Sequence, residues 1–442
     1  MSIFGGYDIR GIYPNDLDAN KAKKLGQAFA LQCKNACVGF DNRSSSQELK
    51  NAFLDGFVKS GGRATIVGLV PTPVLYYSIV KFSSGGGVMV TASHLPAEYN
   101  GFKFLKKTMP LATNELKKLE EDFNSDASTS GEGGVEEKSV EVHYVNHVLS
   151  KTRLGRELKI VLDSGNGVCG PLAKRLFEEL GCEVIGLFIE PDSRFPNHVP
   201  DPHKTETLKW LCDSVKKEKA DLGIALDADG DRCLFVDDLG KPVPGDYSNV
   251  LFALSELRKN PSASVVGELR SSMVFKKEVE ANGGKYFEAK AGRVAVREEM
   301  VKQNAVFSGE ITGHVCFKEN YGFDDGIFAA AKMLELLSNQ SKKLSELISV
   351  IPKYSSSPEY RVNVKNKQEI ITSIKQSFTG KGLKFSELDG VKLVTPNSWG
   401  LVRVSNTEEK ITLRFEGETE KEMLEVKKLF SDELSKLGVA LP

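Results

Sequence analysis

The chain has 442 residues, of which 40% are hydrophobic and 27% are charged, and its formal net charge at pH 7 is −1. This length is too great for one hydrophobic core and predicts roughly three or four domains. The near-zero net charge provides no basic field that would draw the chain to nucleic acid or to an anionic membrane.

Three stretches of the chain follow one plan: an apolar strand leads through a polar loop into a helix, and a glycine ends the helix before a second strand. Apolar residues recur every three or four positions in each helix, as Leu172, Leu176 and Leu180 do in the second stretch. Each stretch is typical of a βαβ unit, so most of the chain should be α/β with largely parallel strands. The three units span residues 36–67, 158–185 and 263–284.

The end of the chain has a different pattern. Two alternating segments, 401–404 and 410–415, flank a polar loop, and a helix over about 418–437 follows, which predicts a small α+β domain. Residues 124–139, rich in Ser, Gly and Glu, predict an exposed loop, and residues 352–358 predict a linker. We therefore predict three related α/β domains and a smaller α+β domain, over residues 1–147, 148–247, 248–354 and 355–442.

Residues 91–103 form the first of four loops that carry chemistry. They follow an apolar strand at 86–90, which should bring Ser93 to the edge of a sheet where ligands bind in open α/β folds. A serine hydroxyl can hold a phosphoryl group covalently, and Lys103 would supply positive charge to that phosphate. Taken alone, the loop is also compatible with a polar turn that bonds only to nearby backbone.

The second loop places Asp227, Asp229, Asp231 and Arg232 directly after an apolar strand at 222–226. Three carboxylates this close repel one another unless they share a cation, and a hard divalent ion with oxygen ligands is the natural one. Magnesium prefers few carboxylates plus phosphate oxygens, so a phosphorylated serine would suit it as a further ligand. A solvated acidic turn is the alternative.

The third and fourth loops are candidates for binding a sugar and a phosphate. Glu310 and Thr312 stand at strand-like spacing before His314, so both could face a sugar, Glu310 by accepting bonds from two hydroxyls. Arg403 lies beside hydroxyl, amide and loop N–H groups, a combination suited to clamping a phosphate. The neighbours of Arg403 in this candidate clamp are Ser405, Asn406 and Thr407. A tight turn and a plain hairpin are the respective alternatives.

Together the four loops resemble those of the α-D-phosphohexomutases, the family of phosphomannomutase and phosphoglucomutase, over essentially the whole chain. The matching motifs are Thr91-Ala92-Ser93-His94-x-Pro96, Asp227-x-Asp229-Gly230-Asp231-Arg232, Gly309-Glu310-x-Thr312-Gly313-His314, Arg403-x-Ser405-Asn406-Thr407 and Tyr7-Asp8-Ile9-Arg10-Gly11. The resemblance implies a heart-shaped protein whose four domains each contribute one loop to a central cleft. It also implies that Arg10 lies by the phosphoserine.

The resemblance further implies a mechanism that uses Mg²⁺ as cofactor, with Ser93 and the three aspartates as metal ligands. Phosphorylated Ser93 would donate to O6 of a hexose 1-phosphate, and the hexose 1,6-bisphosphate, as intermediate and activator, would reorient before its O1 phosphate returns to Ser93. Arg10, Lys103 and Arg232 would be catalytic, and the Arg403 loop would hold the phosphate that is not reacting. The expected partners are small hexose phosphates, in a monomer or homodimer.

One departure from the family pattern affects acid/base catalysis. Ala289-Lys290-Ala291-Gly292-Arg293 aligns with a loop that reads Lys-Thr-Gly-His in many members. A guanidinium does not release its proton near neutral pH, so Arg293 becomes a candidate for substrate binding. Lys290 and His314 are then the acid/base candidates. Arg270 likewise stands where a lysine is common.

The form of the third loop favours phosphomannomutase activity, with glucose phosphates as additional substrates. Phosphoglucosamine mutase is a rival because its corresponding loop is similar. A magnesium-dependent sugar phosphatase is an alternative from a different class, but it would leave the serine loop unexplained.

Cysteine usage and the N-terminus bear on the compartment. The seven cysteines are scattered and include no C-x-x-C pair, which argues against a disulfide framework and a structural zinc site. The sequence shows no signal peptide and no apolar run of about 18 residues. We therefore expect a cytoplasmic protein with no membrane contact.

Overall fold

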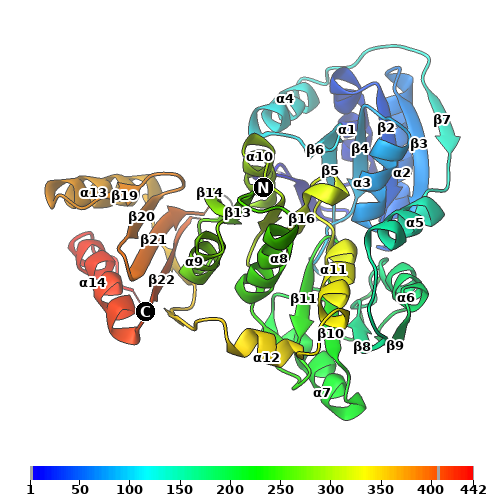
Figure 1. Cartoon of the computed structure of the whole chain (residues 1–442). Helices are drawn as coiled ribbons and strands as arrows, with labels where there is room; N and C mark the ends of the chain where they lie inside the picture. The colour runs from blue at the N-terminus through cyan, green and yellow to red at the C-terminus, as the bar shows by residue number, and fades with distance from the viewer. Residues whose placement is uncertain (1–2, 406–408, 442) are drawn as a thin grey trace.

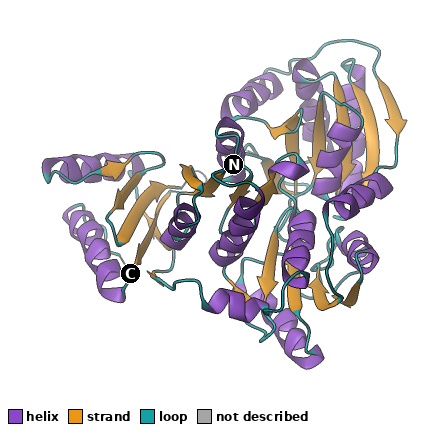
Figure 2. Cartoon of the chain, in the orientation of Figure 1, coloured by secondary structure: helices purple, strands orange, loops and turns teal. Residues whose placement is uncertain are grey.

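The computed structural model describes residues 3–405 and 409–441, and these residues form four sheets with helices packed against them (Figures 1 and 2). The first three sheets and their helices lie against one another, and the fourth stands to one side (Figure 1). The fold is therefore the α/β arrangement in four parts that the sequence predicts.

The first sheet is mixed, in the order β1-β5-β4-β2-β3-β7, with β6 beside β5. Its centre is the predicted βαβ unit, in which β2 and β3 run parallel on either side of α2 in the chain. Apolar side chains of α1 and α2 cover one face of the sheet, and those of α3 and α5 cover the other. The elements are β1 (Ile9–Ile12), α1 (Ala19–Gln32), β2 (Asn35–Phe40), α2 (Ser46–Lys59), β3 (Arg63–Leu69), α3 (Thr72–Lys81), β4 (Gly86–Val90), β5 (Tyr99–Lys106), β6 (Met109–Pro110), α4 (Thr113–Asn124), β7 (Gly134–Glu137) and α5 (Glu141–Lys151).

The second and third sheets have the orders β12-β11-β10-β8-β9 and β14-β13-β15-β16, and each contains its predicted parallel pair, β8 with β9 and β13 with β14. The second comprises β8 (Leu158–Asp163), α6 (Gly170–Glu179), β9 (Cys182–Leu187), α7 (Lys209–Glu218), β10 (Leu222–Leu226), β11 (Cys233–Val236) and β12 (Pro242–Val243). The third comprises α8 (Gly245–Lys259), β13 (Ser264–Glu268), α9 (Met273–Ala281), β14 (Lys285–Ala289), α10 (Arg293–Lys302), β15 (Phe307–Gly309), β16 (Val315–Phe317), α11 (Gly326–Ser338) and α12 (Leu344–Ser349). Short 3₁₀ turns cover Thr205–Leu208 and Lys318–Asn320.

The fourth sheet is antiparallel, in the order β17-β22-β21-β20-β19, with β18 also paired to β22. The two alternating segments read from the sequence are the paired strands β21 and β22, and the last helix begins with a capping box between Thr419 and Glu422. The elements are β17 (Ser355–Ser356), β18 (Tyr360–Asn363), α13 (Lys367–Gly380), β19 (Phe385–Ser386), β20 (Val391–Val394), β21 (Ser398–Val404), β22 (Lys410–Gly417) and α14 (Glu420–Lys436).

Two segments predicted as irregular contain short strands. β7 lies inside the segment 124–139 and pairs with β3 as an edge strand whose four residues are all exposed. β17 lies inside the linker 352–358 and pairs with β22. In both strands the backbone pairing, and not a buried side-chain pattern, defines the strand, which is why the sequence gives no signal for it.

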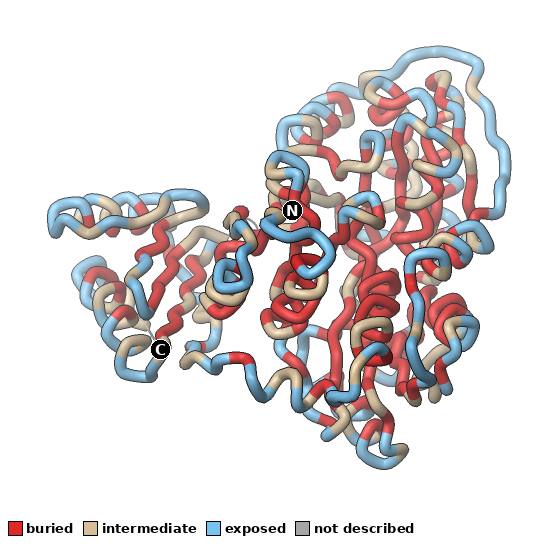
Figure 3. The backbone as a smooth tube through the Cα atoms, in the orientation of Figure 1, coloured by how far each residue is buried: buried red, intermediate tan, exposed pale blue. Residues whose placement is uncertain are grey.

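The buried apolar side chains form clusters of very different extent. One continuous apolar cluster runs through the first three sheets, whereas the fourth sheet and its helices have an apolar cluster of their own (Figure 3). Another, small cluster joins the third and fourth domains and contains Leu269 and Ala291 beside Trp399 and Leu401. Trp399 is 2% exposed and donates from Nε1 to Glu416 at 3.1 Å, and the Lys392 ammonium lies 4.6 Å from the centre of the Trp399 ring. Lys392 also donates to the Leu269 carbonyl at 2.6 Å, and Glu416 accepts from the Met273 N–H at 2.7 Å, so these bonds fix the fourth domain on the third. Among the described residues, no helix has the length and apolar character needed to cross a bilayer.

The buried carboxyl of Asp246 makes this contact between domains sensitive to pH. Asp246 accepts a bond from the Ser272 N–H at 3.0 Å and lies 3.9 Å from Arg414. Burial raises the pKa of Asp246 to about 7, assisted by Glu416 and Glu268 and opposed by Arg414. Since the folded carboxyl binds its proton more tightly than the unfolded one, its contribution to stability is present at pH 4 and is lost as the pH rises to 7.

We expect Asp246→Asn to remove this pH dependence, because the asparagine keeps an oxygen for the Ser272 bond and does not titrate. Between pH 4 and pH 7 the wild type should lose up to about 4 kcal/mol of unfolding free energy relative to the variant. Urea unfolding of both proteins across this range measures the difference. An identical pH slope in the two proteins would contradict the prediction.

Candidate active site

A cavity of about 190 Å³ lies where loops of the first three domains meet. Its lining residues are Tyr7, Asp8, Arg10, Ser93, Lys103, Arg232, Arg270, Gly292, Arg293, Glu310, Thr312 and His314. Eight of these are site residues that the sequence predicts, and they come from segments more than 300 residues apart in the chain. The lining is strongly basic, as a site for phosphorylated ligands requires.

Ser93 is held in a strained conformation at the end of β4. Its φ is +51°, in the left-handed region that residues other than glycine seldom adopt. Backbone contacts fix it there: the Ser93 N–H donates to the Thr91 hydroxyl at 2.8 Å, and Arg43 donates to the Ser93 carbonyl at 2.6 Å. The Ser93 hydroxyl consequently points at the second domain and donates to Asp227 Oδ2 at 2.6 Å.

Asp227, Asp229 and Asp231 are fully buried and turned toward one another, with one carboxylate oxygen from each within 4.8 Å of the others. Lys103 Nζ lies 2.6 Å from Asp229 Oδ2 and 2.5 Å from Asp231 Oδ2, but the remaining oxygens of Asp229 and Asp231 have no hydrogen-bond partner in the described structure. Burial, together with the neighbouring carboxylates, raises the pKa of Asp227 well above its usual range. Buried carboxylate oxygens without donors are suited to a hard divalent cation, so this donor set fits Mg²⁺.

Close packing between domains holds the aspartate loop in place. Gly230 has a φ of +75°, and its carbonyl accepts from the N–H of Gly326, at the start of α11. A Cβ at position 326 would lie 2.4 Å from the Arg232 carbonyl oxygen, so only glycine allows this approach. On the other side, Thr72 of the first domain donates its hydroxyl to Asp229 at 2.6 Å. The loop is thereby fixed between the first and third domains.

Glu310 and Thr312 line the cavity from the tight turn between β15 and β16. The turn packs on the second domain, where the Cys233 N–H donates to the Gly313 carbonyl at 3.1 Å. This contact brings His314 against Arg232, whose Nε donates to His314 Nε2 at 2.9 Å. Burial first, and then the Arg232 charge, lower the pKa of His314 well below its usual range, so the imidazole is neutral with its proton on Nδ1.

Arg270 lines the cavity although the sequence interpretation had not placed it in the site. Glu268 Oε2 accepts from both Arg270 Nε, at 3.0 Å, and Arg270 Nη2, at 2.7 Å, and these two bonds to one oxygen fix the guanidinium. Glu310 lies nearby with Oε1 lacking a partner among the described residues, and burial together with Glu268 raises the pKa of Glu310 well above its usual range. The two-residue spacing of Glu268 and Arg270 at the end of β13 is the signal that could have indicated this pair.

His94 is a second residue that the sequence interpretation did not use. Its Nδ1 lies 3.3 Å from the Ser93 hydroxyl. Burial and the Arg232 charge lower the pKa of His94 far below its usual range, so this imidazole is also neutral. Tyr7 and Asp8, which belong to the N-terminal motif, line the cavity beside Arg10.

Several predicted residues do not line this cavity. Lys290 is exposed just after β14, and its acid/base role stays a prediction. Arg403 pairs with Asp389 at 2.9 Å, and this pair lies close enough to Tyr7 to influence its pKa, which burial raises. Ser405 donates its N–H to the Lys410 carbonyl in the turn after β21. The last two predicted clamp residues, Asn406 and Thr407, lie outside the described residues.

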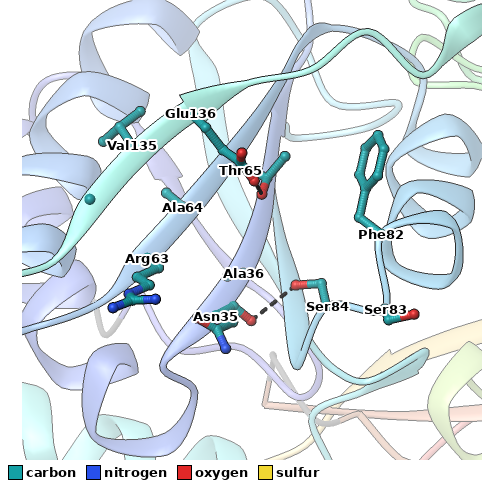
Figure 4. A pocket seen from close by; sticks show the side chains of 11 residues that line it. Asn35, Ala36, Arg63, Ala64, Thr65, Phe82, Ser83, Ser84, Val135 and Glu136 are labelled. Atoms are coloured by element: carbon teal, nitrogen blue, oxygen red, sulfur yellow. Dashed lines mark hydrogen bonds between the residues drawn. The ribbon is translucent and has the colours of Figure 1, made fainter.

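A larger, open hollow of about 420 Å³ lies at the opposite end of the first sheet (Figure 4). The polar groups there already bond to one another, since Thr65 donates to Glu136 at 2.9 Å and Ser84 donates to the Asn35 carbonyl at 3.0 Å (Figure 4). The hollow lies at the amino ends of the parallel strands, whereas ligands bind such sheets at the carboxyl ends. No predicted site residue that the structure describes lines it, so we place the candidate site in the smaller cavity.

A serine that contacts a buried aspartate cluster, within a basic cavity between α/β domains, is an arrangement suited to phosphoryl transfer. Comparison with known proteins then identifies the family. The chain belongs to the phosphoglucomutase/phosphomannomutase family: the models of its α/β/α domains I, II and III match residues 1–130, 142–240 and 244–354, and the model of its C-terminal domain matches residues 359–433.

Individual relatives agree with this assignment. The chain is 38% identical to the phosphomannomutase/phosphoglucomutase of Pseudomonas aeruginosa PAO1, over 100% of this chain and 97% of the relative. It is 36% identical to a phosphoglucomutase of Neisseria meningitidis, over 95% and 93%. A crystal structure of a phosphoglucomutase/phosphomannomutase family protein from Burkholderia thailandensis is 34% identical and superposes with a TM-score of 0.94, covering 100% of this chain and 99% of that one.

Proposed function

We propose that this chain is a phosphomannomutase that interconverts mannose 1-phosphate and mannose 6-phosphate and also acts on glucose phosphates. The observation that carries the proposal is the Ser93 hydroxyl, held 2.6 Å from Asp227 at the edge of a cavity lined by Arg10, Lys103 and Arg232. A hydroxyl in this position can hold a phosphoryl group, and the surrounding cations can stabilise the charge that develops as the group moves. The two-sugar activity is favoured by relatives that carry both names.

The reaction needs two transfers in opposite directions. In the first, the Ser93 Oγ–P bond breaks while a bond forms between phosphorus and O6 of a hexose 1-phosphate, whose hydroxyl gives up its proton. This first transfer leaves Ser93 Oγ protonated. In the second, the bond between O1 and its phosphorus breaks while a bond forms between that phosphorus and Ser93 Oγ, which gives up its proton, and O1 takes up a proton. A free 1,6-bisphosphate can prime Ser93 by the same chemistry, which makes it an activator as well as an intermediate.

Asp227, Asp229 and Asp231 would hold Mg²⁺, with a phosphate oxygen on Ser93 as a further ligand. The ion would supply positive charge at the phosphoryl oxygens. Lys103, which bridges Asp229 and Asp231, keeps these carboxylates in position and lies on the same side as Ser93. Phosphoryl transfer depends mainly on such positioning and charge, not on covalent help from additional groups.

His314 is the acid/base residue that the geometry favours. It is neutral, lines the cavity and accepts a bond from Arg232, so it can take a proton once a substrate hydroxyl displaces that guanidinium. Lys290, the other sequence candidate, is exposed. Glu310 and Thr312 lie where the sugar hydroxyls would be, and Arg270 lies beside them as a further cation for the ligand.

The test is conversion of mannose 1-phosphate and of glucose 1-phosphate to their 6-phosphates, with Mg²⁺ and catalytic glucose 1,6-bisphosphate. We expect both sugars to react, and the ratio of the two kcat/KM values gives the preference. Release of inorganic phosphate without a 6-phosphate product would indicate a phosphatase instead. If neither sugar reacts while glucosamine 1-phosphate does, the chain is a phosphoglucosamine mutase.

A further inference from the structure

Arg293 lines the cavity, but its guanidinium is already engaged by the protein. It donates through Nη2 to Asp8 Oδ1 and through Nη1 to the Tyr76 hydroxyl at 3.1 Å, and Asp324 Oδ2 lies 4.0 Å away. Its side chain is 7% exposed. Burial acts to lower the pKa of Arg293, but Asp8, Tyr76 and Asp324 outweigh it and raise the pKa well above its usual range, so the guanidinium stays protonated. Two of the five N–H donors of this guanidinium are therefore held by the protein, on a side chain that is almost fully buried.

Asp8 shares its carboxylate between two arginines. Oδ1 accepts from Arg293, while Oδ2 accepts from Arg10 Nη2 at 3.0 Å. Burial acts to raise the pKa of Asp8, but Arg293, Arg10 and Lys103 outweigh it and lower the pKa to about 2. Asp8 is therefore ionised at any pH at which the protein works. Of the two arginines, Arg10 is the one with an open face, since its side chain is 30% exposed and lines the cavity beside Ser93.

The backbone around Asp8 is fixed by the residues of the third domain that directly precede Arg293. The Tyr7 hydroxyl donates to the Ala291 carbonyl at 3.1 Å. Gly292, with a φ of +114°, lies so close to the Tyr7 ring that a Cβ there would be 2.7 Å from a ring carbon. The N-terminal motif therefore packs against the start of α10, a helix whose first residue is Arg293.

Taken together, these contacts form a chain of charge that begins in the third domain and ends in the cavity: Arg293, then Asp8, then Arg10. A guanidinium on a long side chain has many rotamers, and a fixed carboxylate restricts it to one. For Arg10, the only carboxylate bond that the structure gives within the described residues is the one to Asp8, and Asp8 is itself oriented by Arg293.

We propose that Asp8 and Arg293 form a positioning pair that orients Arg10 toward the phosphate on Ser93, so that Arg293 acts through Asp8 and not by touching substrate. The inference rests on the proposed function, because it assigns Arg10 to the phosphoserine. It gives Arg293 a role different from the direct substrate contact expected from the sequence.

The test is a double-mutant cycle of Asp8→Asn, Arg293→Met and the two combined. We expect each single variant to lower kcat by about 10- to 100-fold with KM within about threefold, because a displacement near 1 Å of a catalytic group costs that much. The double variant should be no slower than the slower single variant, since both changes break one chain. Transfer of labelled phosphate from glucose 1,6-bisphosphate to Ser93 should slow by the same factor.

Arg297→Met is the matched control. Arg297 lies one turn further along α10, donates to the Thr108 carbonyl of the first domain and contacts the Tyr76 ring, but it makes no bond to Asp8. Arg297→Met could lower kcat and phosphate transfer as much as Arg293→Met does, at a similar melting temperature. In that case the pair of Asp8 and Arg293 serves only to join the domains, and the proposal is wrong. Multiplicative losses in the double variant, with a KM raised in Arg293→Met, would instead show that Arg293 binds substrate directly.

Measurements on the wild-type protein distinguish a failure of this inference from a failure of the proposed function. If the wild type neither converts a hexose phosphate nor retains phosphate on Ser93, the proposed function fails and the positioning role falls with it. If the wild type is active and the single variants match its kcat and its rate of phosphate transfer, only the positioning role is overturned.

Discussion

Ser93→Ala should lower the rate of hexose phosphate interconversion by on the order of a thousandfold or more, because the phosphoryl group loses the oxygen to which it is bound between the two transfers. The backbone bonds that hold this residue, from Arg43 and to Thr91, do not involve the hydroxyl and remain in the variant. The melting temperature should therefore change little. Steady-state conversion of both sugars, with mass spectrometry of the intact chain for retained phosphate, measures the effect.

Ser84→Ala is the control for this experiment. Ser84 precedes the same strand, β4, at its opposite end, where its hydroxyl bonds to backbone carbonyls of Asn35 and Gly86. This variant should keep wild-type rates and retain phosphate. Conversion at near wild-type rate by Ser93→Ala, or phosphate found on another residue, would show that the nucleophile lies elsewhere.

Asp229→Asn should weaken magnesium binding and activity together. Asp229 Oδ2 accepts from Lys103 and from Thr72, while Oδ1 lies buried with no hydrogen-bond partner in the part of the chain that the structure describes. The amide removes one of three negative charges that share a cation site, so we expect the Mg²⁺ concentration for half-maximal rate to rise at least about tenfold. The maximal rate should fall by about 10- to 100-fold.

Two measurements test this prediction, one of them independent of turnover. Mg²⁺ should raise the melting temperature of the wild type more than that of Asp229→Asn, because a bound ion stabilises only the folded chain. Asp213→Asn, which changes an exposed carboxylate on α7, should behave as the wild type in both assays. An unchanged Mg²⁺ dependence in Asp229→Asn would mean that the ion binds at another position.

Local pattern in the sequence predicts the βαβ units and the aspartate loop, because helix and strand periods and short-range charge repulsion are local properties. The alternation of Asp227, Asp229 and Asp231 after a buried strand is enough to predict a cation cluster. That Ser93 meets Asp227 across 134 positions is not a local property, and it was expected only from the family resemblance.

The features that sequence pattern missed depend on contacts between distant segments. Nothing near Arg293 in the chain indicates that its partner is Asp8, 285 positions away, nor that Tyr76 would complete the set. Glu310 and Thr312 were predicted in a loop with strand-like spacing, and they lie in the tight turn that connects the paired strands β15 and β16. The contact of Arg293 with Asp8 depends on packing between domains, and no short stretch of the sequence contains a signal for it.

The uneven division of the buried side chains has a consequence for how the site can open. One apolar cluster extends through the first three domains, whereas the fourth is attached to the third through a small cluster and through the contacts of Lys392 with Leu269 and of Glu416 with Met273. In the proposed mechanism a hexose 1,6-bisphosphate turns end over end beside Ser93, in a cavity that the first three domains line. A rotation of the fourth domain about this contact would leave Ser93 and the three aspartates in place, because all four residues lie in the first two domains.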